Sequence, residues 1–212
     1  AYDDDKGPNT GGMGVYSPVP FVTDEELSQM IAIEQRVVNQ LKKEGVNYSG
    51  CLYGGFMLTK DGPKVLEFNA RFGDPETQVV LPRLQGDLVS ILMACDNGTL
   101  RHQQVSWSDS VAVSVVLASA GYPGSYEKGK EITGIEAAQQ LEGVSVYHAG
   151  TAQTEDGKIV TAGGRVLNVT ALAPTFEEAR ARAYEACDLI NFEGKQLRHD
   201  IGLKALQGRP EK

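Results

Sequence analysis

Apolar residues recur at helical spacing after Thr23, where the chain first becomes periodic. Thr23 precedes Glu26 by three positions, which is the arrangement of a capping box, and apolar residues then return every three or four positions. Gly45 is a natural stop, so we predict a helix that ends near Glu44. Further helices are predicted at Val79–Leu84, Asp87–Asp96, Ile135–Leu141 and Thr175–Asn191.

Shorter apolar runs that are bounded by turn residues predict strands. Cys51–Thr59 and Lys64–Asn69 flank Lys60-Asp-Gly-Pro63, and an Asp-Gly pair between two such runs is typical of a β-hairpin. Strands are also predicted at Val111–Ala118, Val144–Thr151 and Lys158–Leu172. We expect a turn at Glu155-Asp-Gly157, and a bulge or bend at Gly163-Gly164 within the last strand.

The order of these elements predicts a fold of the α+β class. Loops are expected at residues 1–22, 71–77 and 121–124. The pattern turns polar at Arg101–Ser108, and we place a domain boundary there. The sequence therefore predicts two α+β units, residues 1–105 and residues 106–212.

Composition narrows the class of protein. The 212 residues include 24 glycines and 9 prolines, and the apolar share of 41% with 23% charged residues is typical of a globular chain. Acidic residues outnumber basic ones by 28 to 20, and the resulting charge of −8 argues against a broad nucleic-acid or anionic-membrane surface. No apolar run is long enough to predict a transmembrane helix.

The three cysteines are widely spaced and each lies in an apolar stretch. Cys51, Cys95 and Cys187 form no CxxC or Cys/His pair, so structural zinc is not expected. We expect buried, reduced thiols and a cytoplasmic setting. The sequence also lacks a P-loop, a GxGxxG between strand and helix, a GxSxG elbow and an HExxH pair, which excludes the main nucleotide-binding and hydrolase fingerprints.

Polar residues follow one another at the end of the predicted hairpin. Glu67 and Asn69 project to one face of a strand, and their oxygens are ligands of the kind that Mg²⁺ prefers. Arg71 continues that face and could hold a phosphate or a carboxylate, while Asp74 and Glu76 lie on the loop that follows. Taken alone, the same residues also fit an exposed strand face with a salt-bridged arginine.

Three strings of residues give these positions a context. Glu67-Phe-Asn-Ala-Arg-Phe-Gly-Asp-Pro-Glu-Thr-Gln78 closely resembles a signature of phosphoribosylamine–glycine ligases, ATP-grasp enzymes of purine synthesis. Asp5-Lys-Gly-Pro-Asn-Thr-Gly-Gly-Met-Gly-Val-Tyr-Ser-Pro18 matches a second motif of that family. The second unit adds shorter matches: Ala120-Gly-Tyr-Pro-Gly124, His148-Ala-Gly150, Gly163-Gly-Arg-Val-Leu167, Phe192-Glu-Gly194 and Asp200-Ile-Gly202.

The resemblance implies a fold and a reaction. Residues 1–105 would be the C-terminal part of an ATP-grasp fold, an antiparallel sheet with helices, and residues 106–212 the small mixed C-terminal domain of the family. In the family, the carboxylate of glycine attacks the γ-phosphate of ATP to give glycyl phosphate. The amine of 5-phosphoribosylamine then displaces phosphate and forms an amide. The implied partners are these three small molecules, with no nucleic acid and no membrane.

The resemblance also assigns roles to residues. Glu67 and Asn69 would ligate Mg²⁺ or Mn²⁺, and Arg71 would balance charge on the transferred phosphoryl group or hold the incoming carboxylate. Substrate contacts are implied for Asp5, Asn9, Thr10, Gly11, Gly12, Asp74, Pro75 and Glu76. The hairpin strand Cys51–Leu58 carries no acid, although many ATP-grasp enzymes place a further metal ligand there.

Enzymes of this family are about twice as long as the chain. We therefore expect an N-terminal half, with the clamp for adenine and triphosphate, to precede Ala1. Two alternatives stay open: another ATP-grasp ligase that joins a carboxylate to an amine, and a fragment that is structural rather than catalytic as it stands.

Overall fold

The apolar run Val111–Ala118 is the central strand of the larger sheet. In this computed structural model, which describes residues 1–208, all eight residues of β6 (Val111–Ala118) are buried. β6 pairs antiparallel with β1 (Gly14–Ser17) and with β10 (Arg165–Ala173), and β10 pairs antiparallel with β7 (Val144–His148). The strand order is therefore β1-β6-β10-β7. Burial along the whole strand explains why β6 is continuously apolar rather than alternating.

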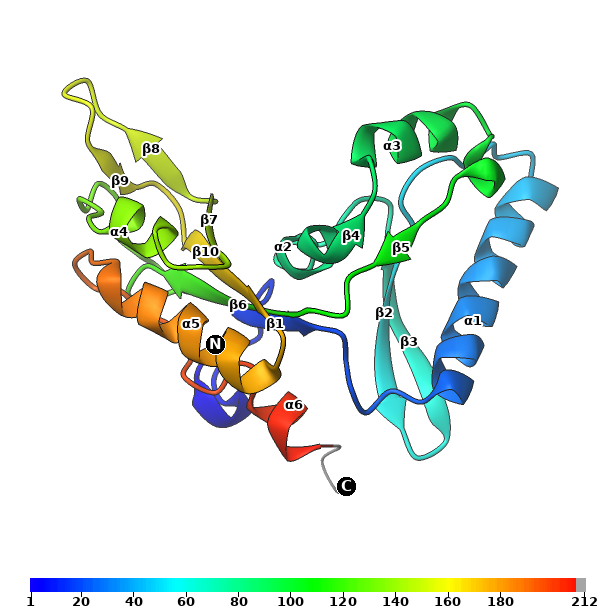
Figure 1. The fold of residues 1–212 in the computed structure, drawn as a ribbon, viewed down its shortest axis with the longest axis horizontal. Coiled ribbons are helices and arrows are strands. Elements are labelled where there is room, and N and C mark those ends of the chain that lie inside the picture. The colour runs from blue at the N-terminus through cyan, green and yellow to red at the C-terminus, as the bar shows by residue number, and fades with distance from the viewer. Residues whose placement is uncertain (209–212) are drawn as a thin grey trace. The chain divides into compact units, whose positions relative to one another are not determined.

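Two helices cover this sheet. α5 (Phe176–Leu189) contacts β6, β10 and β7, and α4 (Ile135–Gln139) contacts β7 and α5 (Figure 1). Thr175 caps α5, because its Oγ1 accepts a hydrogen bond from the Glu178 amide at 3.2 Å. The small residues Ala179 and Ala183 are fully buried and let the helix approach the sheet closely. This packing forms the main hydrophobic core of the protein.

A hairpin and a long helix form a second, separate group. α1 (Asp24–Lys43) begins with the predicted capping box between Thr23 and Glu26 and contacts both strands of the hairpin, β2 (Tyr53–Thr59) and β3 (Gly62–Asn69). α3 (Leu88–Asp96) begins after Asp87, whose carboxylate accepts from the Val89 amide. β4 (Leu84–Gln85) pairs with β5 (Ser106–Trp107).

The remaining elements are short. They are the 3₁₀ turns η1 (Asp3–Asp5), η2 (Leu81–Arg83) and η3 (Leu100–His102), the helices α2 (Thr77–Val80) and α6 (Leu203–Gln207), and the two-stranded β8 (Thr151–Gln153) and β9 (Ile159–Thr161). No helix within residues 1–208 is both long and apolar enough to cross a membrane.

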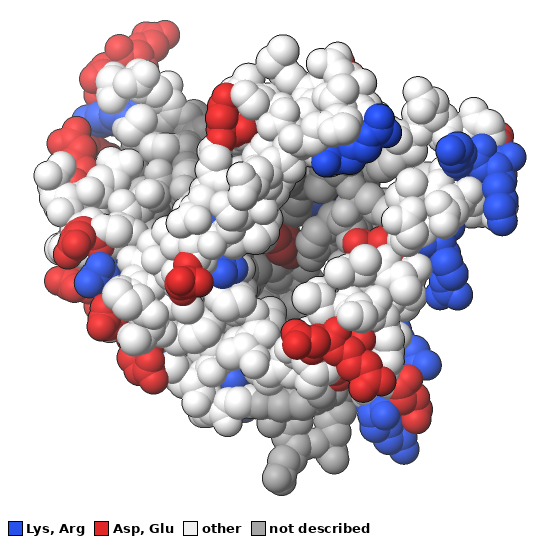
Figure 2. Space-filling view, turned by 45° about the vertical axis from the view of Figure 1, so that its right-hand side comes forward, with Lys and Arg blue, Asp and Glu red and all other residues white. Residues whose placement is uncertain are grey.

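On the face drawn in Figure 2, charged side chains are separated by wide uncharged areas.

The chain divides into two compact units, but not at a single point. Unit 1 contains residues 1–19, 74–83 and the described residues from Ser108 onward, and unit 2 contains residues 20–73 and 84–107. A polar break near residue 105 therefore marks only the last crossing between the units. The simple division into residues 1–105 and 106–212 does not include the first three crossings, because β1 and α2 pack with the second half of the chain.

Several boundaries also differ from those predicted. The expected loop 1–22 contains η1 and β1, because β6 offers β1 a partner strand. The strand predicted at Val144–Thr151 ends before Gly150, whereas the one predicted at Lys158–Leu172 is interrupted at Gly163-Gly164, the position of the predicted bulge or bend. Gly150 and Gly163 approach so closely that a Cβ on Gly150 would stand 2.6 Å from the Cα of Gly163. The helix predicted at Val79–Leu84 is instead α2, η2 and the start of β4.

Candidate active site

Three polar side chains at and just after the end of β3 form a candidate site in unit 2. Glu67 and Asn69 are alternate residues of the strand and share a face. Asn69 Nδ2 donates a hydrogen bond to Glu67 Oε1 at 3.0 Å, and Arg71 Nη2 donates to Asn69 Oδ1 at 3.3 Å. Local structure alone therefore brings together the three residues predicted as metal ligands and charge-balancing group.

The hairpin leaves room for the carboxylate of Glu67. Gly55 lies directly opposite Glu67 on β2, and a Cβ on Gly55 would stand 3.3 Å from Glu67 Cγ. The register then steps to the pair Phe56–Val65, so Leu66 has no partner in the ladder. Such irregularities commonly redirect a side chain beside a site. Gly55 on β2 and the register shift at Leu66 on β3 thus keep the face that carries Glu67 open.

The donors on this face fit a divalent cation with few protein ligands. Glu67 is exposed and Asn69 is half-buried, and they offer a carboxylate and an amide oxygen. Within residues 1–208, no cluster of three or more acidic, His or Cys side chains is arranged to hold a metal. To ligate through oxygen, Asn69 would turn Oδ1 away from Arg71. Phosphate and water oxygens would then complete the shell, which suits an Mg²⁺ ion on a nucleotide.

Arg165 connects a second group of predicted site residues, which lies in unit 1. Arg165 begins β10, and its Nη1 donates to the carbonyl oxygens of Gly11 at 2.9 Å and Asp74 at 2.8 Å. Its Nη2 forms an ion pair with Asp74 Oδ2 at 3.0 Å. One guanidinium therefore joins the two loops that the sequence predicts to contact substrate. The other carboxylate oxygen of Asp74 accepts from Gln78 Nε2 at 2.9 Å, which fixes the loop from its far side.

The glycines of the first loop are required by close contacts. Gly12 has a φ of 111°, and a Cβ there would stand 2.7 Å from Pro75 Cδ. A Cβ on Gly11 would stand 3.2 Å from the guanidinium carbon of Arg165. Thr10 Oγ1 accepts from the Gly12 amide at 3.1 Å, so this hydroxyl shapes the loop. Asn9 is exposed and Glu76 is half-buried.

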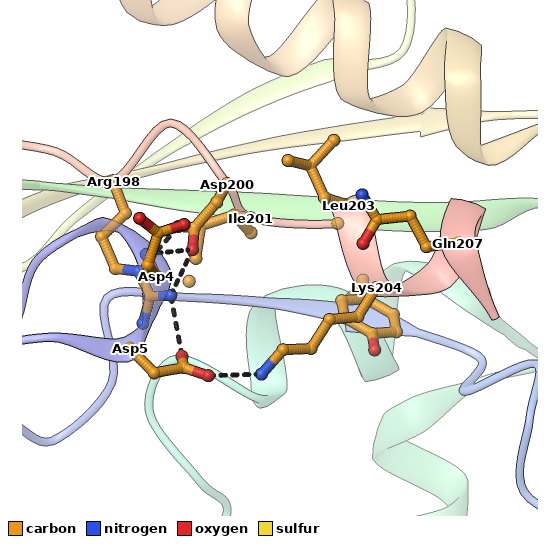
Figure 3. Close-up of a pocket in the computed structure, with 11 residues that line it drawn as sticks. Asp4, Asp5, Arg198, Asp200, Ile201, Leu203, Lys204 and Gln207 are labelled. Carbon is orange, nitrogen blue, oxygen red and sulfur yellow. Dashed lines mark hydrogen bonds and ion pairs between the residues drawn. The ribbon is translucent and has the colours of Figure 1, made fainter. Parts of the chain in front are cut away.

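Asp5 lies in the wall of a cavity of about 360 Å³ (Figure 3). Its carboxylate pairs with Lys204 at 2.6 Å and with Arg198 at 2.9 Å, and the pKa of Asp5 is lowered by these two cations, Lys204 first. Arg198 also pairs with Asp200 at 2.6 Å, which lowers the pKa of Asp200 to about 2. Both oxygens of Asp5 therefore already have cationic partners.

The predicted site residues fall into two groups. Glu67, Asn69 and Arg71 belong to unit 2, whereas the residues of the two predicted substrate loops belong to unit 1: Asp5, Asn9, Thr10, Gly11, Gly12, Asp74, Pro75 and Glu76. The change of unit falls between Gly73 and Asp74, inside the string Glu67–Gln78. Sequence reasoning assigned no role to Arg165 or Arg198. Both stand in or beside the short strings of the second half, which was the available signal.

Solved structures define the class of fold. The crystal structure of N5-carboxyaminoimidazole ribonucleotide synthetase from Thermotoga maritima superposes with a TM-score of 0.58 at 17% identity, over 84% of this chain and 45% of that one. At that identity the likeness concerns the fold alone. The fold, with its mixture of helices and antiparallel sheets, is of the α+β class and corresponds to part of an ATP-grasp enzyme.

Closer relatives identify the family. Residues 1–77 match the model of the phosphoribosylglycinamide synthetase ATP-grasp (A) domain, and residues 112–204 match that of the C domain of the same synthetase. The phosphoribosylamine–glycine ligase of Caldanaerobacter subterraneus is 51% identical over 94% of this chain and 47% of its own length. The crystal structure of the Thermotoga maritima ligase has a TM-score of 0.79 at 40% identity, over 94% of this chain and 48% of that one.

The chain belongs to the phosphoribosylamine–glycine ligase family. It spans about half the length of the two ligases just compared.

Proposed function

We propose that the chain supplies the metal-binding strand and the substrate loops of an ATP-dependent ligase. The reaction would join glycine to 5-phosphoribosylamine and give glycinamide ribonucleotide, ADP and phosphate. The observation that carries the proposal is the hydrogen-bonded set Glu67, Asn69 and Arg71, which lies within the string that resembles the family signature. Membership of the family supports the choice of substrates.

Unit 2 would serve the phosphoryl end of the reaction. Glu67 and Asn69 would hold Mg²⁺ or Mn²⁺, which, when bound, neutralises phosphate charge and orients ATP. Arg71 would hold the carboxylate of glycine or the transferred phosphoryl group, because its guanidinium matches the paired oxygens of either. Positioning and charge neutralisation are what phosphoryl transfer requires of a protein, so no nucleophilic side chain is needed.

Unit 1 would serve the amine substrate. The backbone amides of Gly11 and Gly12, with Asn9 and Thr10, would approach phosphoribosylamine, since neither glycine carries a side chain of its own. Asp74 and Glu76 would meet the amine or the ribose hydroxyls, and Pro75, whose side chain is fully buried, would support the loop beside Gly12. Support comes from Arg165, which joins the Gly11 and Asp74 loops through one side chain.

The proposed enzyme needs further chain to bind ATP. We infer that an N-terminal half supplies the clamp for adenine and triphosphate, because the ligases matched are about twice as long. A reducing, cytoplasmic setting is proposed from the three free cysteines, of which Cys187 is buried and Cys51 and Cys95 are half-buried. Burial raises the pKa of Cys187 to about 12, which keeps that thiol protonated.

The proposal is tested by changing Glu67 in the complete ligase that contains this chain. Glu67→Gln keeps the size of the side chain but removes its charge, and we expect kcat to fall by at least about 100-fold. Asp61→Asn is the matched control, because Asp61 is an exposed carboxylate at the turn of the same hairpin. Amide formation is measured with glycine and phosphoribosylamine, and Mn²⁺ binding in the presence of ATP by electron paramagnetic resonance.

Three results would contradict the assignment. Unchanged amide formation by Glu67→Gln would remove Glu67 from the metal site. Activity of the parent ligase with a different carboxylate or amine, and none with glycine and phosphoribosylamine, would favour another ATP-grasp ligase. If the parent forms no amide with any such pair, the structural alternative gains support instead.

A further inference from the structure

We propose that Arg198 is a positioning residue that sets the glycine-rich loop through Asp5 and Asp200, and that Asp5 anchors this loop rather than contacting substrate. The proposal rests on the function proposed above, in which this loop receives phosphoribosylamine. Residues 198–204 are called the C-terminal brace below.

The brace holds the entry to the loop by ionic and backbone contacts. Arg198 Nη2 pairs with Asp5 Oδ1 at 2.9 Å and with Asp200 Oδ2 at 2.6 Å (Figure 3). Asp200 Oδ2 in turn accepts from the Asp4 amide at 3.0 Å, and Lys204 pairs with Asp5 Oδ2. The Arg198 and Asp200 side chains are only 15% and 19% exposed, so water screens their pairing weakly.

The backbone at this entry adopts a conformation that needs external support. Asp4 and Asp5 have φ values of 60° and 56°, in the left-handed region that residues other than glycine rarely adopt. Two such residues in succession persist only where surrounding contacts hold them. The contacts of Arg198 and Asp200 with these two residues supply that restraint.

The brace is itself held rigidly by α5. Tyr184 Oη donates to the Arg198 carbonyl at 2.7 Å and accepts from the Ile201 amide at 3.1 Å. Arg180 donates to the carbonyl oxygens of Ile201 and His199, at 3.1 Å and 2.5 Å. Because α5 is packed on the main core, these hydrogen bonds fix the C-terminal brace relative to that core.

The same segment also meets the exit of the loop. A Cβ on Gly14 would stand 2.6 Å from Ile201 Cγ1, so β1 begins in direct contact with the brace. Between the entry at Asp5 and this exit, residues 7–9 are exposed. The exposed part of the loop is thus fixed at both ends by residues nearly 200 positions later in the sequence. Loss of Arg198 should loosen the entry while the exit stays in place.

The contacts of Asp5 define its role. A carboxylate that receives a substrate amine needs an oxygen without a cationic partner, and both oxygens of Asp5 already pair with Lys204 and Arg198. Its negative charge is therefore balanced within the protein. The side chain can act on the reaction only through the loop that it anchors.

The experiment uses the complete ligase with Arg198→Ala and Arg198→Lys. We expect Arg198→Ala to raise the KM for phosphoribosylamine by about tenfold or more, because a displaced loop binds that substrate poorly. The KM for ATP should stay within about twofold, and Arg198→Lys should restore part of the loss through one ion pair. Lys130→Ala is the control, since Lys130 bridges Glu127 and Glu193 in the same unit.

A cycle of Asp5→Asn, Arg198→Ala and the double variant separates anchoring from contact. If Asp5 acts through Arg198, the double variant loses no more than the more severe single variant. Additive losses would instead show that Asp5 meets the substrate, and would overturn its assignment. Kinetic constants of Arg198→Ala equal to those of Lys130→Ala would overturn the role of Arg198.

Hydrogen exchange gives a second readout that does not depend on turnover. The amides of residues 6–12, Pro8 excepted, should exchange faster in Arg198→Ala than in the parent or in Lys130→Ala. If the parent forms no amide product, the proposed function fails, and exchange alone then decides the bracing. Unchanged exchange in Arg198→Ala overturns it in either case.

Discussion

Within unit 1, three arginine side chains each join segments that are separate in the sequence. Arg165 and Arg198 each use the planar fork of the guanidinium to reach two partners, and both are largely buried. Arg83 does the same at the end of η2, where it donates to Ser17 Oγ and to the carbonyl oxygens of Ser108 and Ser110. A lysine could replace only some of these hydrogen bonds, because its single ammonium group lacks the two-pronged guanidinium geometry.

The pairing of Asp200 predicts a dependence of stability on pH. The pKa of Asp200, about 2, lies below the ordinary value of 3.8, so the folded state favours the charged form of this side chain more than the unfolded state does. This stabilisation is complete above about pH 4 and is lost as the pH falls toward 2. Asp200→Asn should therefore lower the free energy of unfolding at neutral pH by about 1–2 kcal/mol and flatten its slope between pH 4 and 2.

Urea unfolding at several pH values tests this prediction. Asp188→Asn on α5 is the control, because Asp188 is an exposed carboxylate in the same unit. An Asp200→Asn slope equal to that of the parent would mean that Arg198 does not favour the charged form of Asp200.

At the scale of elements, β1 depends on a partner that the local sequence does not reveal. The strand lies in a stretch rich in Gly and Pro, and it forms because β6 pairs with it and Ile201 packs against Gly14. The opposite case is α1, whose capping box and apolar spacing define it locally. The strands β8 and β9 also form locally, because they pair with each other across the predicted turn at Glu155-Asp-Gly157.

Gly14→Ala should destabilise the chain by about 1–3 kcal/mol, because the added methyl group would overlap the side chain of Ile201. Thermal and urea unfolding measure the change. The cost should shrink in an Ile201→Ala background, where the space is open. An equal cost in both backgrounds would mean that backbone conformation, and not this contact, selects glycine.

At the scale of the whole molecule, the two units differ sharply in how much they bury. Within the described residues, unit 1 contains the main core, whereas only Pro63, Gly73 and Ala94 are buried in unit 2. Several large apolar side chains of unit 2 are exposed, among them Leu66 at 63%, Val89 at 64% and Met93 at 60%. We expect further chain to cover part of this surface in a complete ligase.

The difference in burial between the two units predicts that their backbone amides are protected from hydrogen exchange to different degrees in the isolated chain. Amides of β6 and β10 should exchange only through global unfolding, while those of α1 and the β2–β3 hairpin should exchange faster by at least about tenfold. Hydrogen exchange followed by mass spectrometry measures both. Uniform protection across the two units would show that unit 2 gains its stability from contacts other than buried apolar area.

The sequence by itself determined the elements whose signals are local: α1 with its Thr23 cap, the Asp-Gly hairpin, the buried run of β6 and α5 after Thr175. It also predicted the face that we propose binds a metal, because alternation along one strand places Glu67 and Asn69 on the same side. The tertiary structure alone decided that residues 1–19 and 74–83 pack with the second half of the chain, and that Arg165 and Arg198 contact the glycine-rich first loop. The physical reason is range: caps and strand alternation act over a few residues, whereas these arginines meet partners more than 90 positions away, which only folding brings within hydrogen-bond distance.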